Sequence, residues 1–139
     1  MIIQEMNDTI KLQFDSDLSD KKLKIFSYNS EKYNAKIDLK MDKDFLVEVV
    51  IHKALSVLPQ AFLEEYEKGI NPIKVKYDQW ADSAFIYLVN VKLGESKSTF
   101  PFNPYEIGAE INLDFDKDDK FLSIEVLYAS KHLPRELLK

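Results

Sequence analysis

Four short blocks of this chain occur twice, in the same order, and this duplication constrains the fold more than any other feature. The paired blocks, by residue number, are 10–15 with 73–78, 25–29 with 86–90, 37–43 with 111–117, and 47–63 with 122–138. The third pair reads Ile-Asp-Leu-Lys-Met-Asp-Lys in the first half and Ile-Asn-Leu-Asp-Phe-Asp-Lys in the second. One such match arises easily by chance, but four in one order do not. The sequence therefore predicts two structurally equivalent repeats.

The two predicted repeats meet at a short seam, and we expect all 139 residues to form one compact unit. Gly69 follows a helical pattern of apolar residues, and Pro72 stands three residues later. Glycine just past the last turn, with proline shortly beyond, is the usual signal for a helix end. We therefore place the first repeat at residues 9–68, the seam at 69–71 and the second repeat at 72–138.

Within each repeat, apolar residues alternate with polar ones at a period of two. Ile10, Leu12 and Phe14 show this pattern in the first half, as residues 111–115 do in the second. Because successive side chains of a strand point to opposite faces, the pattern predicts strands with one buried and one solvated face. Short polar residues predict turns over Asp15 to Asp20 and over residues 116–119.

A short helix is predicted to follow the strands of each repeat. In the first half, apolar residues recur at helical spacing at Leu55, Leu58, Phe62 and Tyr66. With about four strands before each helix, we expect an α+β fold of two fused ββββα repeats. A sheet with one apolar face needs a partner, and the other repeat is the simplest one. The sequence thus predicts two antiparallel meander sheets packed as a pseudo-twofold sandwich.

The composition excludes several classes of protein. Without cysteine, the chain has neither disulfides nor thiolate metal ligands. The formal net charge is −5, and all basic residues but Arg135 are lysines, so a basic face for nucleic acid is not expected. The first residues lack a basic, apolar leader, and charged residues interrupt the longest apolar-rich stretch, residues 45–63. We expect a cytoplasmic protein without cofactors that binds neither nucleic acid nor membranes.

The second half carries a recurring polar signature: Tyr77-Asp78, Ala81-Asp82 and Ile86, then an acidic turn, then Ile124-Glu125-Val126 and Ala129-Ser130. In these residues it resembles a family of short bacterial domains of unknown function. The resemblance covers nearly all of residues 72–138 and implies a fold but no activity. The family usually has a glycine where this chain has Asp118-Asp119, and the first half has Val50 in place of Glu125. Such domains are usually single, so the tandem resembles a fused symmetric dimer, and we expect a monomer or a homodimer.

Acidic residues of the second half have the spacing of a calcium-binding EF loop. The ligand positions 1, 3, 5 and 12 of such a loop fall on Asp114, Asp116, Asp118 and Glu125. Two observations favour a solvated acidic turn instead: Asp119 holds the position that needs glycine, and the flanks alternate like strands. A small-ligand or divalent-metal sensor that uses these acids, with Asp78 and Asp82, is kept as the alternative hypothesis.

No motif of the sequence has the arrangement of a catalytic site. His52 and His132 lack the spacing to a second ligand that a metal site needs, and surface or helix-edge positions are expected for both. Ser130 has no nucleophile elbow around it. Glu125 is a site candidate if it points inward, where its pKa would rise, and otherwise lies on the solvated face of the sheet. We therefore expect no enzymatic activity.

Residues 91–107 have little counterpart in the first half and contain three aromatic residues and two prolines in a polar context. The aromatic residues are Phe100, Phe102 and Tyr105. Aromatic side chains on a rigid loop are good contact anchors, because they lose little entropy on binding. Alternatively, Phe100 and Phe102 close the open end of the sandwich. We interpret the protein as a non-enzymatic protein-interaction module of the inhibitor, antitoxin or immunity type, with these three aromatics as partner contacts.

Overall fold

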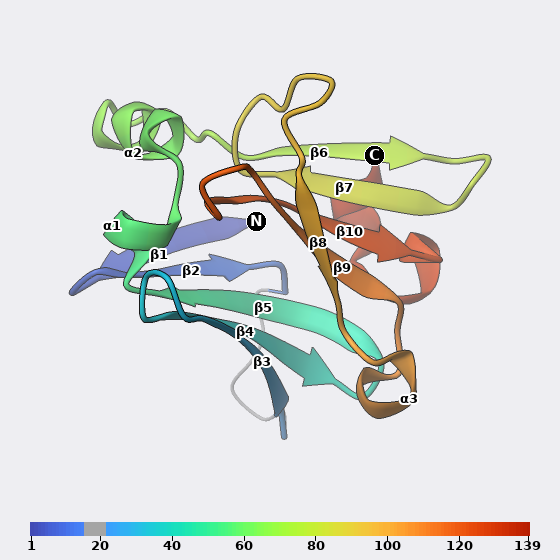
Figure 1. Ribbon diagram of the computed structural model, residues 1–139. Coiled ribbons are helices and arrows are strands. Elements are labelled where there is room, and N and C mark those ends of the chain that lie inside the picture. Colours follow the sequence, from blue (N-terminus) through green and yellow to red (C-terminus); the bar gives the residue numbers. More distant parts are fainter. Residues whose placement is uncertain (16–21) are drawn as a thin grey trace.

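The computed structural model describes residues 1–15 and 22–139, which form two five-stranded antiparallel sheets (Figure 1). The first sheet has the order β1-β2-β5-β4-β3, with β1 (Ile2–Met6), β2 (Thr9–Gln13), β3 (Lys24–Ser30), β4 (Ala35–Asp42) and β5 (Phe45–His52). The second has the order β6-β7-β10-β9-β8, with β6 (Lys74–Asp78), β7 (Ser83–Tyr87), β8 (Ser98–Pro101), β9 (Ile111–Phe115) and β10 (Phe121–Leu127). Apart from Asp15, the turn predicted over residues 15–20 lies outside the described residues.

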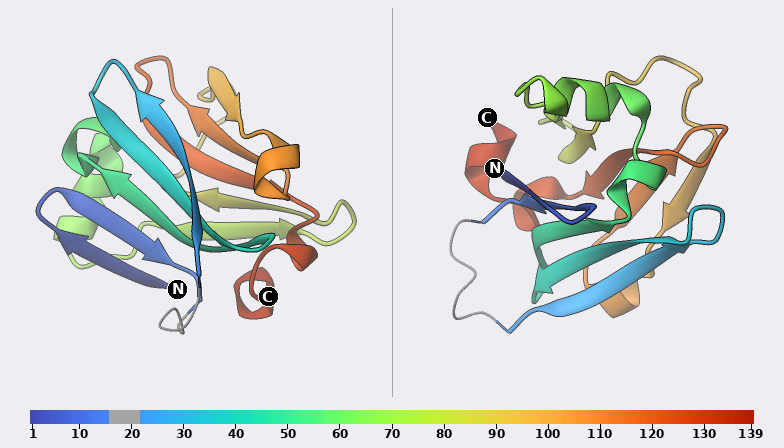
Figure 2. Two further views of the ribbon diagram at one scale, coloured as in Figure 1. Left: turned by 90° about the horizontal axis from the view of Figure 1, so that it is seen from below. Right: turned by 90° about the vertical axis from the view of Figure 1, so that its left-hand side faces the viewer.

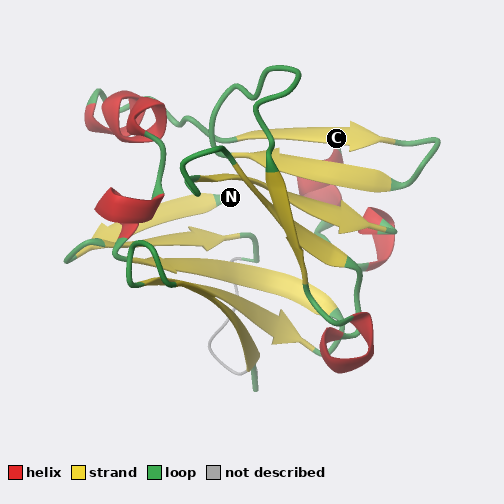
Figure 3. Cartoon of the chain, viewed as in Figure 1, coloured by secondary structure: helices red, strands yellow, loops and turns green. Residues whose placement is uncertain are grey.

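Short helices follow each sheet (Figure 3). After β5 come α1 (Ala54–Val57) and α2 (Gln60–Glu67), and after β10 come two 3₁₀ turns, η1 (Ala129–Lys131) and η2 (Arg135–Leu138). A further short helix, α3 (Pro104–Ile107), lies between β8 and β9. The predicted α+β class, mostly strand with helices after each sheet, is confirmed. Within the described residues, no helix is long and apolar enough to cross a membrane.

The two sheets have the same strand order, so β1 to β5 correspond in turn to β6 to β10. This equivalence supports the predicted duplication. Two details of the prediction are wrong. Each sheet has five strands rather than about four, because β1 precedes the predicted start of the first repeat at residue 9 and β8 lies within residues 91–107. The sheets are also not simple meanders, because β2 pairs with β5 and β7 with β10, which leaves β3 and β8 at the far edges.

The shared strand order corrects half of the sequence alignment. The alignment matches β4 with β9 and β5 with β10, as the structure does. It also matches residues 10–15 with 73–78, which belong to β2 and β6, although β2 corresponds to β7. Likewise it places residues 25–29 of β3 on the end of β7, although β3 corresponds to β8. Residues 91–107 are therefore not an addition to the second half, because they contain the counterpart of β3.

One hydrophobic core lies between the two sheets, which the views of Figure 2 show as two layers. The alternating residues of the strands supply it from both sides, among them Leu12, Ile37 and Ile51 of the first sheet and Ile86, Leu113 and Ile124 of the second. Phe62 and Leu63 of α2 join the same cluster. At the β3 edge, the Tyr28 ring lies 4.8 Å from the rings of both Phe100 and Phe115. The repeats thus cover each other's apolar faces.

His132 directly follows η1 and is buried between the repeats, so it has the expected helix-edge position rather than a surface one. Only 7% of the residue is exposed. Its Nδ1 lies 2.6 Å from the carbonyl oxygen of Asp44, and its own carbonyl accepts a hydrogen bond from the amide of Leu46 at 2.9 Å. A carbonyl can only accept, so Nδ1 is the donor of the first bond. These bonds join the end of the second repeat to the β4–β5 turn of the first.

Candidate functional site

The turn between β6 and β7 displays Trp80 at one end of the second sheet. The carboxylate of Asp78 accepts hydrogen bonds from the amides of Trp80 at 3.0 Å and Ala81 at 3.2 Å. An aspartate that bonds to the backbone two or three residues on fixes a tight turn. The Trp80 side chain itself is fully exposed. Asp78, a residue of the predicted ligand set, therefore holds the turn that presents the tryptophan.

Asp82 ties the same turn to the segment that follows β10. Its Oδ1 accepts hydrogen bonds from the Tyr77 hydroxyl at 2.7 Å and the Ser130 amide at 2.9 Å, and its Oδ2 accepts one from the Ser130 hydroxyl at 2.6 Å. These bonds, led by that from the Ser130 hydroxyl, hold the pKa of Asp82 below its ordinary value of 3.8. The bond to Asp82 also raises the pKa of Tyr77.

The first repeat contains a simpler version of this latch. The carbonyls of Asp8 and Asp82 accept hydrogen bonds from the amides of Ala54 and Ala129, at 3.0 and 2.8 Å. The Asp8 carboxylate accepts one from the Leu55 amide at 2.7 Å, just as Asp82 does from Ser130. Both aspartates have positive φ, 61° and 50°. A feature present in both repeats, at the same place in each sheet, has a structural role, so Asp82 belongs to the scaffold.

A second rigid turn presents Tyr105. The side chain of Asn103 accepts a hydrogen bond from the Tyr105 amide at 3.0 Å, with Pro104 in the first turn of α3 and Gly108 ending the helix at φ 81°. This is the usual pattern of a capped helix start and a left-handed helix end. Ile107 anchors α3 in the core, while 97% of Tyr105 is exposed. The backbone of α3 is fixed and its aromatic side chain is free.

The other two predicted contact residues lie elsewhere. Phe102 is only 8% exposed and belongs to the core, so it has no surface to offer a partner. Phe100, which is 37% exposed, lies on edge strand β8 with its ring 5.2 Å from that of Phe102 and 4.8 Å from that of Tyr28. Phe102 thus takes the alternative role of closing the sandwich, and Phe100 is only partly available.

Three exposed aromatic residues belong to segments on the same side of the molecule. The β6–β7 turn, η1 and α3 all lie on the right-hand side of the view in Figure 1. Trp80 belongs to the first of these segments, Tyr128 directly precedes η1, and Tyr105 belongs to α3. Tyr128 is half exposed and directly precedes Ala129, whose amide bonds to Asp82. We call Trp80, Tyr105 and Tyr128 the aromatic end. Trp80 and Tyr128 were not among the predicted contacts, and an aromatic residue inside a polar turn is the signal that indicates them.

The acidic turn between β9 and β10 satisfies its own backbone. Asp116 Oδ1 accepts hydrogen bonds from the amides of Asp118 at 2.8 Å and Lys120 at 2.9 Å, and Asp119 has a positive φ of 62°. The carbonyl of Asp118 accepts a hydrogen bond from the Tyr33 hydroxyl of the first repeat. In the described part of the chain, no three acidic or histidine side chains converge as metal ligands. The EF-like spacing therefore does not produce an EF loop.

Asp114 and Glu125 lie on the outer face of the second sheet, away from the turn. Asp114 accepts hydrogen bonds from the hydroxyls of Thr99 at 2.7 Å and Ser123 at 3.0 Å. Glu125 is half-buried and accepts one from the Asn112 side chain at 2.9 Å. Glu125 therefore lies on the outer face of the sheet, which is the second of the two positions that the sequence left open for it.

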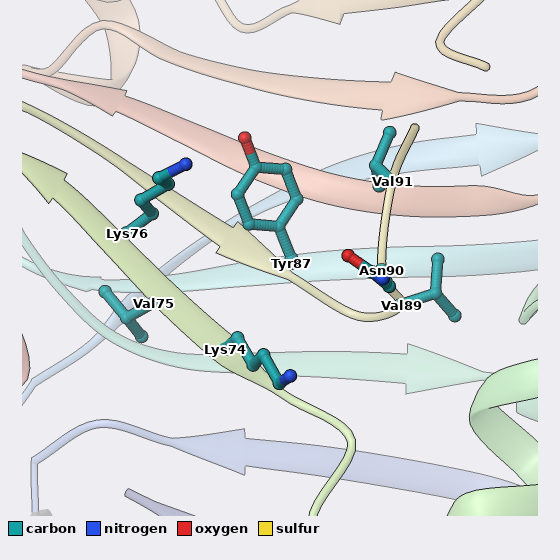
Figure 4. A pocket seen from close by; sticks show the side chains of 7 residues that line it. All are labelled: Lys74, Val75, Lys76, Tyr87, Val89, Asn90 and Val91. Carbon is teal, nitrogen blue, oxygen red and sulfur yellow. The ribbon is translucent and has the colours of Figure 1, made fainter. Parts of the chain in front are cut away.

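A hollow of about 330 Å³ lies beside this face, between β6 and the segment that follows β7. Figure 4 shows the Tyr87 ring standing between Lys76 on one side and Val91 on the other. Burial raises the pKa of the Tyr87 hydroxyl, and the nearby carboxylates of Asp114 and Glu125 add to the effect. The sequence alone did not indicate this hollow, because its walls come from β6, β7 and a loop.

Residues 74–130 match a family described as a protein of unknown function, DUF2283. Residues 74–130, most of the second repeat, are a DUF2283 domain. The match begins with β6 and ends at Ser130, so it includes both partners of the Asp82 latch. No curated protein and no solved structure matches the chain.

The DUF2283 domain explains the resemblance found in the sequence. The polar residues of the signature, Tyr77, Asp78, Asp82 and Ser130, hold the β6–β7 turn and fasten it to the end of β10. In the first repeat, Leu55 takes the place of Ser130, and the bonds that remain are those from the backbone amides of Ala54 and Leu55 to Asp8. The signature of the DUF2283 domain is therefore a structural one in this chain.

Proposed function

We propose that the protein is a non-enzymatic module that binds another protein through its aromatic end. The observation that carries this proposal is the full exposure of Trp80 and Tyr105 on turns whose backbones are fixed by Asp78 and Asn103. Large aromatic side chains on fixed backbones bury much apolar area at little entropic cost and are typical binding hot spots. A partner that covers these two side chains removes their apolar surface from water, which favours binding.

The non-enzymatic part of the proposal rests on what the polar groups already do. Both carboxylate oxygens of Asp82, whose pKa is displaced, are engaged by Ser130 and Tyr77. The Ser130 hydroxyl donates to Asp82, while the His132 ring, two residues on, faces the Asp44 carbonyl. A serine nucleophile activated by histidine needs the ring within hydrogen-bond reach of its hydroxyl, whereas Ser130 donates to Asp82 and His132 bonds to the Asp44 carbonyl. A small acidic protein with such a surface fits an inhibitor, antitoxin or immunity role.

The test is affinity capture from the native host with tagged variants, followed by mass spectrometry. Trp80→Ala and Tyr105→Ala remove the two fully exposed aromatics and leave the backbone bonds of both turns in place. Leu93→Ala is the matched control, because Leu93 is also a fully exposed apolar residue but lies in the loop between β7 and β8. Circular dichroism and thermal melting check that each variant is folded.

We expect one stoichiometric partner with the unchanged protein and with Leu93→Ala, and at least tenfold weaker binding of the purified partner to Trp80→Ala and Tyr105→Ala. A partner that binds all four proteins equally would show that the aromatic end is not the binding surface. If no partner is captured under any condition, the protein-binding function is wrong.

A further inference from the structure

The outer face of the second sheet has its charges sorted by strand. Strand register places Lys76, Phe85 and Glu125 side by side across β6, β7 and β10. Two residues away along each strand, a second row across the same three strands contains Lys74, Tyr87 and Ser123. On the next strand, β9, Asp114 pairs with Ser123. Lys74 and Lys76 are exposed, and Phe85, Tyr87, Asp114 and Glu125 alternate with buried residues of their strands, so these side chains point away from the core. Ser123 belongs to the same row but is itself buried. From β6 to β9 the face is basic, then aromatic, then acidic.

The aromatic strip at the centre of this face is flat. The rings of Phe85 and Tyr87 lie 5.5 Å apart at an interplanar angle of 9°, and both residues are half-buried. Two parallel rings side by side on a sheet form a flat aromatic surface that a docking molecule can contact. Another aromatic pair would stack well there.

The acidic side chains on the outer face of the first sheet form ion pairs, whereas, in the part of the chain that the structure describes, those on the outer face of the second sheet do not. On the first sheet, Asp38 lies 2.8 Å from His52 and 3.8 Å from Lys36, and Glu48 lies 3.4 Å from Lys40. Within residues 1–15 and 22–139, Asp114 and Glu125 accept hydrogen bonds only from neutral side chains and have no ion pair. Lys74 and Lys76 line the hollow beside Tyr87 on the same face.

We propose that a second copy of this chain docks on the face formed by Lys74, Lys76, Phe85, Tyr87, Asp114 and Glu125. In this dimer the two faces pack against each other, and the twofold axis lies between them, parallel to β7. The β6 strand of each copy then lies opposite the β10 strand of the other. Lys76 of each copy then lies opposite Glu125 of the other, and the Phe85 and Tyr87 rings of the two copies stack at the axis. Each Lys74 lies opposite Ser123, within reach of Asp114. The basic-to-acidic order across the face is what makes it self-complementary.

This contact forms a closed dimer and does not extend into a larger assembly. The equivalent row on the first sheet is Gln4, Lys11, Val50 and Asp38, which has no aromatic strip and whose acid is already paired. Each chain therefore offers one such face, and an isologous contact through one face uses it up. Trp80 and Tyr105 are not part of this face, so both remain free in the dimer to bind the partner proposed above.

Charge reversal tests the dimer. Lys76→Glu places two acids opposite each other at both symmetric contacts, and Glu125→Lys places two cations there. In an equimolar mixture of the two variants, every such contact becomes Glu opposite Lys again. Lys117→Glu, in the exposed β9–β10 turn, is the control with the same change of net charge as Lys76→Glu. Sedimentation velocity and light scattering at low salt, over a range up to on the order of 100 µM, measure the dimer, since compact interfaces span a wide affinity range.

We expect the unchanged protein and Lys117→Glu to dimerise with the same dissociation constant. Each of Lys76→Glu and Glu125→Lys should raise that constant by about tenfold or more, because like charges placed opposite each other are strongly unfavourable. The mixture of the two, and the double variant Lys76→Glu/Glu125→Lys, should restore it. A monomer at every concentration would overturn the proposal. So would a dimer that both single variants leave intact, or one that the mixture fails to restore while circular dichroism shows folded chains.

Discussion

The Ser130 hydroxyl donates a 2.6 Å hydrogen bond to the carboxylate of Asp82, 48 residues earlier in the chain. The bond fastens the β6–β7 turn to the segment after β10, and the Ser130 amide and the Tyr77 hydroxyl reinforce it. Asp8 has the same place in the first repeat, but within the described residues its carboxylate accepts one hydrogen bond, from the backbone amide of Leu55. The two aspartates therefore offer a matched pair for testing how the latch contributes to the fold.

Asp82→Asn should lower the midpoint of thermal unfolding more than Asp8→Asn does. Asparagine tolerates positive φ as well as aspartate, so neither change strains the backbone. The first change weakens three hydrogen bonds to a charged acceptor and the second weakens one. Differential scanning calorimetry measures both. Equal shifts in the two variants would show that the Ser130 and Tyr77 bonds add nothing to the backbone part of the latch.

The stabilising effect of Asp82 should disappear in acid. Its pKa is lowered in the folded state, so its contribution is fully present above the unfolded pKa of about 3.9 and is lost as the pH falls through the folded value. Urea unfolding between pH 6 and pH 2 checks this. The difference in unfolding free energy between the unchanged protein and Asp82→Asn should be constant above about pH 5 and shrink below pH 4. A difference that grew in acid would have the wrong sign.

Gly108→Ala should destabilise the protein by about 1–2 kcal/mol, because alanine pays a penalty in the left-handed region that Gly108 occupies at φ 81°. A Cβ at this position would also lie 3.4 Å from the Cβ of Asp44. Gly94→Ala is the matched control, since Gly94 has φ 85° and no neighbour within 4 Å of the added Cβ. Chemical denaturation should show a loss for both and the larger loss at Gly108. A larger loss at Gly94 would show that α3 does not depend on its close approach to Asp44.

The fragment that ends at Gly69 should be insoluble or self-associating. Removal of the second repeat uncovers the inner face of the first sheet, where Leu12, Ile37 and Ile51 are fully buried in the intact chain. Size-exclusion chromatography of the expressed fragment tests this. Co-expression with residues 70–139 should restore a soluble one-to-one complex, because each half again covers the other. A well-behaved, folded monomer of the first half alone would show that the repeats are independent domains.

The sequence predicted the duplication correctly where the repeated residues belong to the buried strands at the centre of each sheet. The blocks in β4 and β9, and in β5 and β10, carry apolar residues on both sides of a charged turn, and the alignment paired them as the structure does. The blocks at residues 10–15 and 25–29 were paired one strand away from their true counterparts. Any half-buried strand has the same alternation of apolar and polar residues, so the pattern identifies a strand but not its neighbours.

The candidate site divides in the same way. The aromatic residues of 91–107 were visible in the sequence, but only packing decided that Phe102 enters the core while Tyr105 remains in solvent. Asp78 and Asp82 were visible as a pair of acids, yet the partners that make them a turn and a latch include Ser130, far along the chain. Hydrogen bonds between distant residues have no sequence signal of their own.

By itself, the sequence determined the α+β class, the two repeats and the polar signature of the DUF2283 domain, because alternation, turn residues and repetition are local properties of the chain. Tertiary structure alone decided the strand order, the burial of His132 between the repeats, the exposure of Trp80, Tyr105 and Tyr128, and the sorting of charge across the outer face. These features depend on which strands lie side by side, and that choice is made by the packing of two apolar faces against each other.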